Sequence, residues 1–361
     1  MRTYRRLYGQ VYDWDNLYLA YRKARKGKRG RQPAASFEFD LEQNLVQLQE
    51  ELAARTYQPG SYQSFYIHEP KRRLISAAPF RDRVVHHALC NIIEPIFERS
   101  FIHDSYANRV GKGTHRALDR AQHYSRRFRY VLQCDVRQFF PSIDHALLRA
   151  TLVRRIADPD ILWLIDRILD SGSGVLSEAY DPVYFPGDDL FDLNRPRGLP
   201  IGNLTSQFWA NCYLNPLDHF VKRSLNCLGY VRFVDDLLLF ANDSATLWRW
   251  HAALVGEMAD LRLSFHPGAH PRPVAEGMPF LGFIVFPTHR RLKRRKGIHF
   301  QRRFKALRLA YQRGEATFDQ TQASVQGWVN HVRYADTWGL RRAILSRYPM
   351  PRQLTGSDPQ H

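Results

Sequence analysis

Two adjacent aspartates interrupt an apolar stretch near residue 235. The segment "VRFVDDLLLF" (231–240) reads as a buried strand or hairpin, yet Asp235 and Asp236 lie at its centre. Burying a carboxylate costs free energy, and two adjacent carboxylates also repel each other. Either the chain turns out into solvent here, or a cation neutralises the pair. A tight hairpin reversal at the doublet would carry both side chains to the edge of a sheet.

A third carboxylate, Asp135, follows the apolar stretch "YVLQC". If the two strands are neighbours, the three carboxylates converge, and two Mg2+ ions about 3.5–4 Å apart would balance their charge. Mn2+ is a substitute for Mg2+ in such a site. This arrangement stabilises in-line attack on phosphorus, which both hydrolysis and polymerisation use. The alternative interpretation is a solvated turn and a helix-capping aspartate.

Basic residues elsewhere favour polymerisation. Lys71, Arg72 and Arg73 precede a short β-like segment, and Arg109 and Lys112 lie on a glycine-bearing loop. A polymerase must hold a triphosphate, whereas a nuclease need not. The guanidinium fork suits this task because it binds two phosphate oxygens at once.

A second aspartate doublet serves as a comparison. Asp188 and Asp189 lie in "FPGDDLF", between Pro-Gly and a polar loop. We expect solvent to hydrate both of these charges, so that they need no cation.

The elements that position these residues can be read from apolar spacing and turn residues. We expect a helix over 37–55, and a strand that ends at Pro79 and is followed by a helix. Further along we expect a helix capped near Thr114, a strand over 130–134, and a helix beginning at Ser142 or Asp144. The remaining expected elements are a long apolar helix after Gly202, a β-like return over 278–286 and a basic, helical stretch of 70 C-terminal residues.

Charge indicates the kind of partner. The chain has 361 residues, with 53 Lys and Arg against 35 Asp and Glu, a formal charge of +18 and a pI near 10.0. Such a surface points to nucleic acid, with an anionic membrane as the weaker option. "RKARKGKRGR" (22–31) is either a solvated arm or a phosphate-binding one. Between Arg290 and Lys305 there are nine Lys or Arg and no acid.

Other sequence features argue against alternative classes. The four cysteines form no CxxC pair, so we expect buried free thiols, and a metal role for His86 and His87 lacks partners at ligand spacing. The start "MRTYRRLYGQ" is no secretory signal, and the charge-free run "GLPIGNLTSQFWANCYLNPL" is too polar for a membrane span. We therefore expect a cytoplasmic protein without membrane contact.

Several segments, in order along the chain, resemble a reverse transcriptase of the bacterial, group II intron-like class. "RRLISAAPFRDRVVHHAL" resembles the opening fingers motif and "SYANRVGKGTHRAL" the triphosphate-contacting loop. "CDVRQFFPSIDH" is similar to the first-aspartate motif, "RFVDD" to the F/Y-x-D-D hairpin and "FLGF" to the segment that grips the primer end. "SVQGWVNHVRYADTWGLRRAIL" looks like the helical thumb.

The resemblance implies metal ligands. Asp135 and Asp235 would hold the two ions, Asp236 would assist, and the backbone carbonyl of Val136 would be a further ligand.

The resemblance also implies substrate contacts. Arg73 and Arg109, with Lys71, would bind the incoming triphosphate. Phe140 would be the steric gate against a ribose 2′-hydroxyl, although it could equally be ordinary core. Further contacts with the nucleotide fall on Ile201, Gly202 and Gln207. Contacts with primer and template fall on Leu281, Gly282, Phe283 and Lys112.

One motif departs from most relatives. A glutamine usually precedes the motif glycine, in a Q-G-x-x-x-S-P pattern, whereas "IGNLTSQ" has Ile201 and ends on Gln207. This pattern is similar to reverse transcriptases of diversity-generating retroelements, which copy a template RNA with errors at adenines. An aliphatic side chain in place of an amide makes fewer polar contacts, so discrimination between correct and incorrect base pairs should be weaker. The alternative is that the exchange has no effect on fidelity.

A second departure concerns proton transfer. The family usually has a lysine after the catalytic hairpin and its helix, but "LSFHPGAHPRPVAEG" has none. His266, His270 or Arg272 are the substitutes that this segment offers.

The resemblance implies an α+β right-hand polymerase with an antiparallel-sheet palm, inserted fingers and a helical thumb. We expect a basic N-terminal extension and helix over 1–60, fingers over 61–128, a palm over 129–289 with part of the fingers interleaved, and a basic helical thumb and tail over 290–361. Expected partners are template RNA, cDNA product, dNTPs and a small basic accessory protein. Alternatives are a retron, antiphage or group II intron-derived reverse transcriptase, or a catalytically inactive RNA-binding scaffold.

Overall fold

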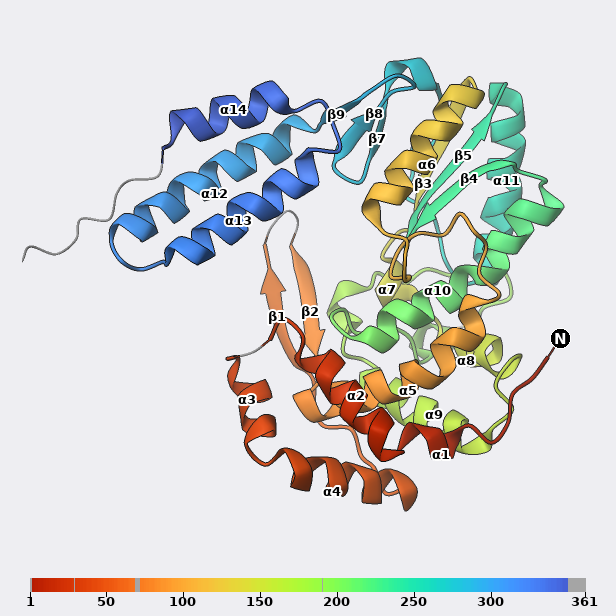
Figure 1. Cartoon of the computed structure of the whole chain (residues 1–361). Helices are drawn as coiled ribbons and strands as arrows, with labels where there is room; N and C mark the ends of the chain where they lie inside the picture. The colour runs from red at the N-terminus through yellow and green to blue at the C-terminus, as the bar shows by residue number, and fades with distance from the viewer. Residues whose placement is uncertain (1, 29, 69–71, 190, 350–361) are drawn as a thin grey trace, which may run out of the picture.

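Every strand pairing within the three sheets is antiparallel, and helices form most of the remainder (Figure 1). The computed structural model describes residues 2–28, 30–68, 72–189 and 191–349. The strands are β1 (Gln63–Ile67), β2 (Arg73–Ala77), β3 (Tyr130–Asp135), β4 (Gly229–Phe233), β5 (Asp236–Ala241), β6 (Pro271–Pro273), β7 (Met278–Phe280), β8 (Phe283–Val285) and β9 (Arg290–Leu292). The expected α+β class is therefore confirmed.

The helices precede, separate and follow these strands. They are α1 (Tyr8–Val11), α2 (Trp14–Arg25), α3 (Gln32–Phe39), α4 (Leu41–Ala53), α5 (Phe80–Glu98), α6 (Thr114–Arg127), α7 (Phe139–Ser142), α8 (His145–Val153), α9 (Pro159–Gly172), α10 (Leu204–His219), α11 (Ser244–Asp260), α12 (Arg294–Gln312), α13 (Phe318–Val332) and α14 (Trp338–Arg347). Short 3-10 turns lie at Ser177–Ala179, Phe191–Asn194 and Val274–Glu276, and a π-helical turn at Phe220–Ser224. No described helix has the length and apolar character needed to cross a bilayer.

A four-stranded sheet in the order β4-β5-β3-β6 organises the core. Its central strands are buried on both faces because alternate side chains enter two different apolar clusters. Leu237 and Leu239 point into the cluster that includes α10 and α11, whereas Leu238 and Phe240 pack with α6. This burial explains why "LLLF" reads as a continuous apolar run rather than as an alternating one.

The N-terminal helices pack beside this core, chiefly through contacts between α2 and α5. The predicted single helix over 37–55 is wrong, because the chain breaks at Asp40 between α3 and α4. Asp40 has φ −114° and ψ 48°, outside helical geometry. Phe37 consequently belongs to α3, where it packs against Phe80.

Three other predicted boundaries can be compared with the structure. The strand before Pro79 and the helix after it are confirmed as β2 and α5. Of the two starts expected for the helix after β3, Asp144 is right for α8, because its carboxylate accepts a hydrogen bond from the amide of Leu147 at 3.0 Å. Helix α6 does begin at Thr114, but it is preceded by Gly113 and has no side-chain cap.

The C-terminal part forms a three-stranded sheet, β7-β8-β9, and three helices to one side of the molecule (Figure 1). Helices α12 and α13 pack through the rings of Phe300 and Trp328, which stack at 3.8 Å. The expected basic helical stretch is confirmed for α12–α14, but Arg290 lies in strand β9 instead. Residues 350–361 of the predicted tail lie outside the described residues.

Candidate active site

The Asp235–Asp236 doublet lies at a two-residue hairpin turn. Phe233 pairs with Asp236 across the β4–β5 hairpin, so Val234 and Asp235 form the reversal. Val234 has φ +56°, a left-handed conformation that is unusual for a β-branched residue and costs about 1–3 kcal/mol. The surrounding structure must hold this turn in place.

A fully buried arginine supports the turn. The guanidinium of Arg232 donates two hydrogen bonds to the carboxylate of Asp218, at 2.8 and 2.7 Å, and both side chains are 0% exposed. The same guanidinium donates to Asn211 Oδ1 at 3.0 Å and to the carbonyl of Val234 at 3.1 Å. Sequence reasoning missed Arg232, although a charge inside an apolar strand signals a buried partner.

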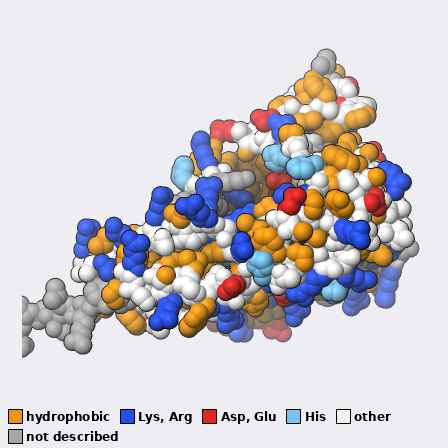
Figure 2. Space-filling model, turned by 90° about the horizontal axis from the view of Figure 1, so that it is seen from above, with side chains coloured by type: hydrophobic (Ala, Val, Ile, Leu, Met, Phe, Trp, Pro, Cys, Tyr) orange, Lys and Arg blue, Asp and Glu red, His pale blue; other side chains and the backbone are white. Residues whose placement is uncertain are grey.

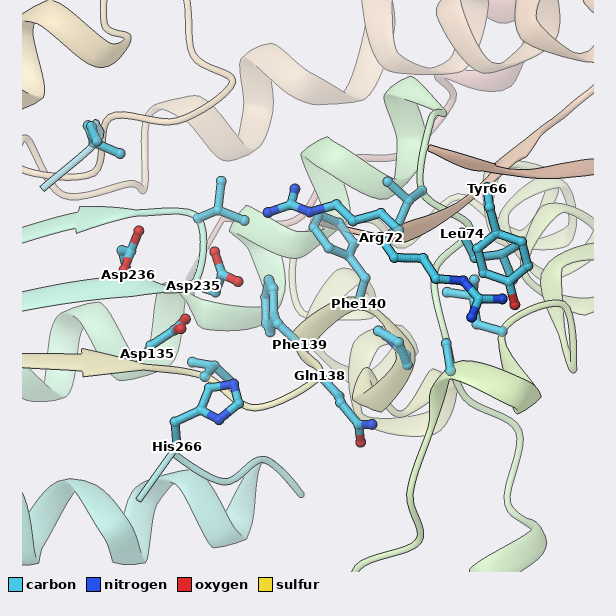
Figure 3. A pocket seen from close by; sticks show the side chains of 18 of the residues that line it. Tyr66, Arg72, Leu74, Asp135, Gln138, Phe139, Phe140, Asp235, Asp236 and His266 are labelled. Atoms are coloured by element: carbon cyan, nitrogen blue, oxygen red, sulfur yellow. The ribbon is translucent and has the colours of Figure 1, made fainter. Parts of the chain in front are cut away.

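Asp135 lies beside the doublet. It is the register partner of Asp236 in the β3–β5 pairing, and the amide of Val136 donates to the carbonyl of Asp235 at 3.2 Å. All three aspartates line one cavity of about 1040 Å³, and Figure 3 shows their side chains grouped on neighbouring segments. The predicted proximity of Asp135 to Asp235 is therefore confirmed.

Burial and mutual repulsion outweigh the effect of nearby cations on the pKa values of Asp235 and Asp236. Burial raises the pKa of Asp236 to about 7, with repulsion from Asp235 and Asp135 adding to it. Burial also raises the pKa of Asp235, and Asp135 contributes again.

The donor set fits hard divalent cations, which take carboxylate, carbonyl and water oxygens. Val136 lines the same cavity and has its carbonyl in the chain segment next to Asp135. Within the described ranges, no three acidic, histidine or cysteine side chains already surround one metal-sized point. A bound divalent cation would relieve the mutual repulsion of these carboxylates.

One wall of the cavity comes from strand β2 and the segment before it. Arg72 and Arg73 line the cavity, and the Arg72 guanidinium lies 4.0 Å from the ring centroid of Tyr66 (Figure 3). Lys71 lies outside the described residues. The charge of Arg73 opposes the rise in the pKa of Asp235, whereas Arg72 is stacked on Tyr66.

Phe140 and Ile201 also line the cavity, as the sequence predicted. Phe140 is half-buried and packs against the core, and its neighbour Phe139 also lines the cavity but is only 3% exposed. Gln207 is on α10 and does not contribute to the described cavity lining. Gly202, which follows Ile201, has φ +120°. A Cβ atom at this position would lie 3.1 Å from Ile75 Cγ2.

The loop that carries Ile201 is fastened to strand β2. The carbonyl of Ile201 accepts a hydrogen bond from the amide of Ser76 at 2.9 Å. Asn203 is 1% exposed, and its side chain accepts from the amide of Ala78 at 3.1 Å and donates to the carbonyl of Ser76 at 2.9 Å. Sequence reasoning did not identify Asn203, because Ser76 and Ala78, its partners in β2 and just after it, lie more than a hundred residues away.

The structure does not bring Arg109 or Lys112 to this cavity. The Arg109 guanidinium is held by the carboxylate of Glu98 at 2.6 Å and by the carbonyls of Ile102 and Ser105. Lys112 donates to the carbonyl of His103 at 2.8 Å. Both cations therefore stabilise the loop that follows α5, which corrects their expected placement against substrate.

Residues of the "FLGF" segment divide between cavity and core. Leu281 lines the cavity with φ +45°, and Gly282 follows it with φ +91°. Phe283 is 0% exposed and packs in the core. Among the three expected lysine substitutes, only His266 lines the cavity in the described chain, whereas the imidazole of His270 contacts the carbonyl of Gly268 at 2.8 Å and Arg272 lies in β6.

A lysine does reach the cavity, from further along the chain. Lys293 lies between β9 and α12, and its amide donates to the carbonyl of Gly282 at 3.1 Å. Its charge lowers the pKa of Asp236 against the effects of burial and the neighbouring carboxylates. Sequence reasoning sought a lysine immediately after the hairpin and its helix, and so missed this one.

The comparison doublet differs from expectation. Asp188 is not hydrated, because its side chain is 3% exposed and pairs with Arg195 at 2.9 Å and Arg262 at 3.6 Å. Asp189 is exposed and accepts from the amide of Phe191 at 2.7 Å. The four cysteines are buried and free, as expected.

Sequence comparisons agree with this geometry. A family model described as reverse transcriptase (RNA-dependent DNA polymerase) matches residues 67–285, more than half of the chain. The chain therefore belongs to the reverse transcriptase family.

Several curated proteins are similar over part of their length. Protein YkfC of Escherichia coli (strain K12) is 27% identical over 184 residues, which cover 48% of this chain and 44% of that protein. The group II intron-encoded protein LtrA of Lactococcus lactis subsp. cremoris is 26% identical over 226 residues, covering 61% and 35%. Nuclear intron maturase 2, mitochondrial, of Arabidopsis thaliana is 26% identical over 168 residues, covering 42% and 23%. The chain thus spans less than half the length of these relatives.

Proposed function

We propose that this chain is an RNA-directed DNA polymerase that makes cDNA from a template RNA by two-metal nucleotidyl transfer. The observation that carries the proposal is the convergence of Asp135, Asp235 and Asp236 on one cavity that Arg72 and Arg73 also line. Membership of the reverse transcriptase family supports it.

The carboxylates of Asp135 and Asp235, assisted by Asp236 and the carbonyl of Val136, would hold two Mg2+ ions, with Mn2+ as a substitute. When bound, these ions supply charge neutralisation and alignment for attack of a primer hydroxyl on the α-phosphorus of a dNTP. Arg73, with Arg72, binds the triphosphate. Phe140 stands where it excludes a ribose 2′-hydroxyl, and Leu281 contacts the primer end.

The arrangement of sheets and helices supports the right-hand architecture of a polymerase, with palm, fingers and thumb. The β4-β5-β3-β6 sheet with its helices (within 129–289) is the palm, the β1–β2 hairpin region (61–128) provides fingers, and helices α12–α14 (within 290–361) form a thumb. Residues 1–60 are a helical N-terminal extension. Seen from above, Lys and Arg side chains gather along the elongated C-terminal part and around a hollow in the molecule (Figure 2). These side chains contact template RNA and the cDNA, and a small basic accessory protein works with the enzyme.

Primer extension on an RNA template tests the activity. We expect Asp235→Asn to abolish extension in Mg2+, because the substitution removes one ligand charge with little change in shape. Asp189→Asn, in the exposed half of the other doublet, should extend like the unmodified chain. Full extension by the Asp235→Asn variant, with RNA bound normally by both variants, would refute the proposed site.

We further propose the diversity-generating type, with errors concentrated at template adenines. It is supported by Ile201, an aliphatic side chain that lines the cavity, at the motif position where the resemblance leads us to expect a glutamine. Sequencing of the cDNA should show misincorporation at adenines, and Ile201→Gln should reduce it. Errors spread evenly over all four template bases would refute the assignment to the diversity-generating type but not the proposed polymerase activity.

A further inference from the structure

A glutamine interrupts the apolar strand that leads to Asp135. The flanking residues Leu132 and Cys134 of β3 are 0% exposed, whereas Gln133 is half-buried and lines the catalytic cavity. Successive side chains of a strand point to opposite faces of the sheet, so Gln133 and Asp135 share one face. The glutamine therefore lies on the same face of the sheet as a carboxylate of the site.

The strand register relates Gln133 to one member of the aspartate doublet. Asp236 is the register partner of Asp135, and Leu238 is that of Gln133. Gln133 and Asp236 are therefore diagonal neighbours on one face of the β3–β5 pair, at a separation that a long side chain can span. Asp235 lies in the reversal between β4 and β5, outside this pairing.

The two aspartates of the doublet consequently have different neighbours. Burial and the adjacent carboxylates raise the pKa of Asp236, and a hydrogen bond from the Gln133 side chain and the charge of Lys293 oppose this rise. Burial also raises the pKa of Asp235, but the opposing cation there is Arg73. The amide of Gln133 is thus a donor to the carboxylate of Asp236.

Lys293 reaches Asp236 from another part of the chain. It lies between β9 and α12, and its backbone amide donates to the carbonyl of Gly282 at 3.1 Å. Asp236 is therefore influenced by β3 and also by the segment that follows the C-terminal sheet. A buried carboxylate that its neighbours repel keeps one orientation only where such groups hold it.

We propose that Gln133 is a positioning residue for nucleotidyl transfer, whose amide holds the Asp236 carboxylate in place between the metal site and Lys293. Gln133 acts through Asp236, and not on the nucleotide. The inference rests on the proposed polymerase activity and its divalent cations, and is independent of the error-prone type.

Primer extension on an RNA template gives the first test. Gln133→Met keeps an unbranched side chain but removes the donor, so we expect kcat to fall about 10- to 100-fold, as for the loss of a hydrogen bond to a charged group. The KM for dNTP should change less. Gln47→Met is the matched control, because Gln47 donates to the carboxylate of Glu51 at 2.9 Å on the exposed side of α4. This variant should extend like the unmodified chain. Gln133→Leu repeats the test with a shorter side chain if the methionine variant unfolds.

Binding of Mn2+ to the chain without RNA or nucleotide gives a second reading that does not depend on turnover. The electron paramagnetic resonance signal of free Mn2+ measures the affinity. We expect Gln133→Met to weaken Mn2+ binding about tenfold, because a carboxylate held in place binds a cation more tightly than one that must first be ordered. In the Asp236→Ala chain the same change should have no further effect, because no carboxylate is left to hold.

The double variant decides between positioning and packing. If the effects of Gln133→Met and Asp236→Ala multiply, Gln133 acts independently of Asp236 and the inference is overturned. Unchanged kcat and unchanged Mn2+ affinity in Gln133→Met would overturn it as well. Both results require an active unmodified chain and leave the polymerase proposal standing. An unmodified chain that neither binds Mn2+ nor extends a primer would instead overturn the proposed polymerase, and this inference with it.

Discussion

The guanidinium of Arg232 donates a hydrogen bond to the carbonyl of Val234, and so ties a fully buried cation to the strained residue that precedes Asp235. Asp218 neutralises that cation through two hydrogen bonds. The buried ion pair thus acts on a specific turn, where displacement of the carboxylate by about 1 Å would cost activity.

We expect Arg232→Lys to lower kcat for primer extension by about 10²-fold, because the ammonium group keeps the charge but cannot reach Asp218, Asn211 and Val234 together. The KM for dNTP should change less, since Arg232 does not contact substrate. The Mg2+ concentration for half-maximal rate should rise. Arg149→Lys, in a half-exposed pair, is the control. An Arg232→Lys variant with unchanged kcat and unchanged Mg2+ dependence would contradict the positioning role.

Phe140→Ala should relax the choice of sugar. Removing the ring from the cavity wall makes room for a 2′-hydroxyl, so we expect discrimination between dNTP and rNTP to fall by about tenfold or more. Competition between dCTP and CTP in single-nucleotide extension measures it. Phe139→Ala, which removes a ring that is only 3% exposed, should chiefly lower the free energy of unfolding, by about 3–5 kcal/mol. Unaltered rNTP rejection by Phe140→Ala would assign that ring to the core alone.

Lys293 is the expected proton donor to pyrophosphate, because a lysine carries its proton at neutral pH and this one lines the cavity. Lys293→Ala should slow single-turnover extension by about 10²-fold or more and remove the solvent deuterium isotope effect. Lys293→Arg should restore part of the rate. If His266→Ala shows the larger loss and Lys293→Ala none, the histidine takes this role.

Acid should destabilise the fold through His86. Burial lowers the pKa of His86 to about 3, against an ordinary value near 6.5, so the unfolded chain binds more protons between these limits. The free energy of unfolding should therefore fall as the pH drops below about 6.5, by up to about 1.4 kcal/mol per pH unit from this residue. Urea denaturation of His86→Leu at several pH values should show a shallower dependence, whereas His68→Leu, at an exposed position, should match the unmodified chain. Parallel curves for His86→Leu and the unmodified chain would contradict the assignment.

Local patterns predicted the parts of the site that lie at strand ends. Asp135 and the Asp235–Asp236 doublet each follow an apolar strand, and antiparallel pairing of those strands places them together. Arg109 was misplaced because its partner, Glu98, lies across a loop whose path no local pattern reveals.

Lys293 escaped prediction for a similar reason. It enters the cavity through the β7-β8-β9 sheet, which brings a distant segment back toward the carboxylates. The expected hydration of Asp188 failed because it pairs with Arg195 and with Arg262, which lies more than seventy residues later. The spacing of residues along the chain predicts single helices and strands. The positions of Lys293 and Asp188 depend instead on how these elements pack against one another.

The attachment of Ile201 to strand β2 couples two tasks of the proposed enzyme. Ser76 and Asn203 join the Ile201 loop to β2, the strand that begins at Arg73. If that strand moves toward a bound triphosphate, we expect these hydrogen bonds to move the Ile201 side chain with it. Triphosphate binding and the position of Ile201 at the new base pair would then be coupled. Weakening the hydrogen bonds of Asn203 should therefore change the error rate, although Asn203 itself does not contact the base.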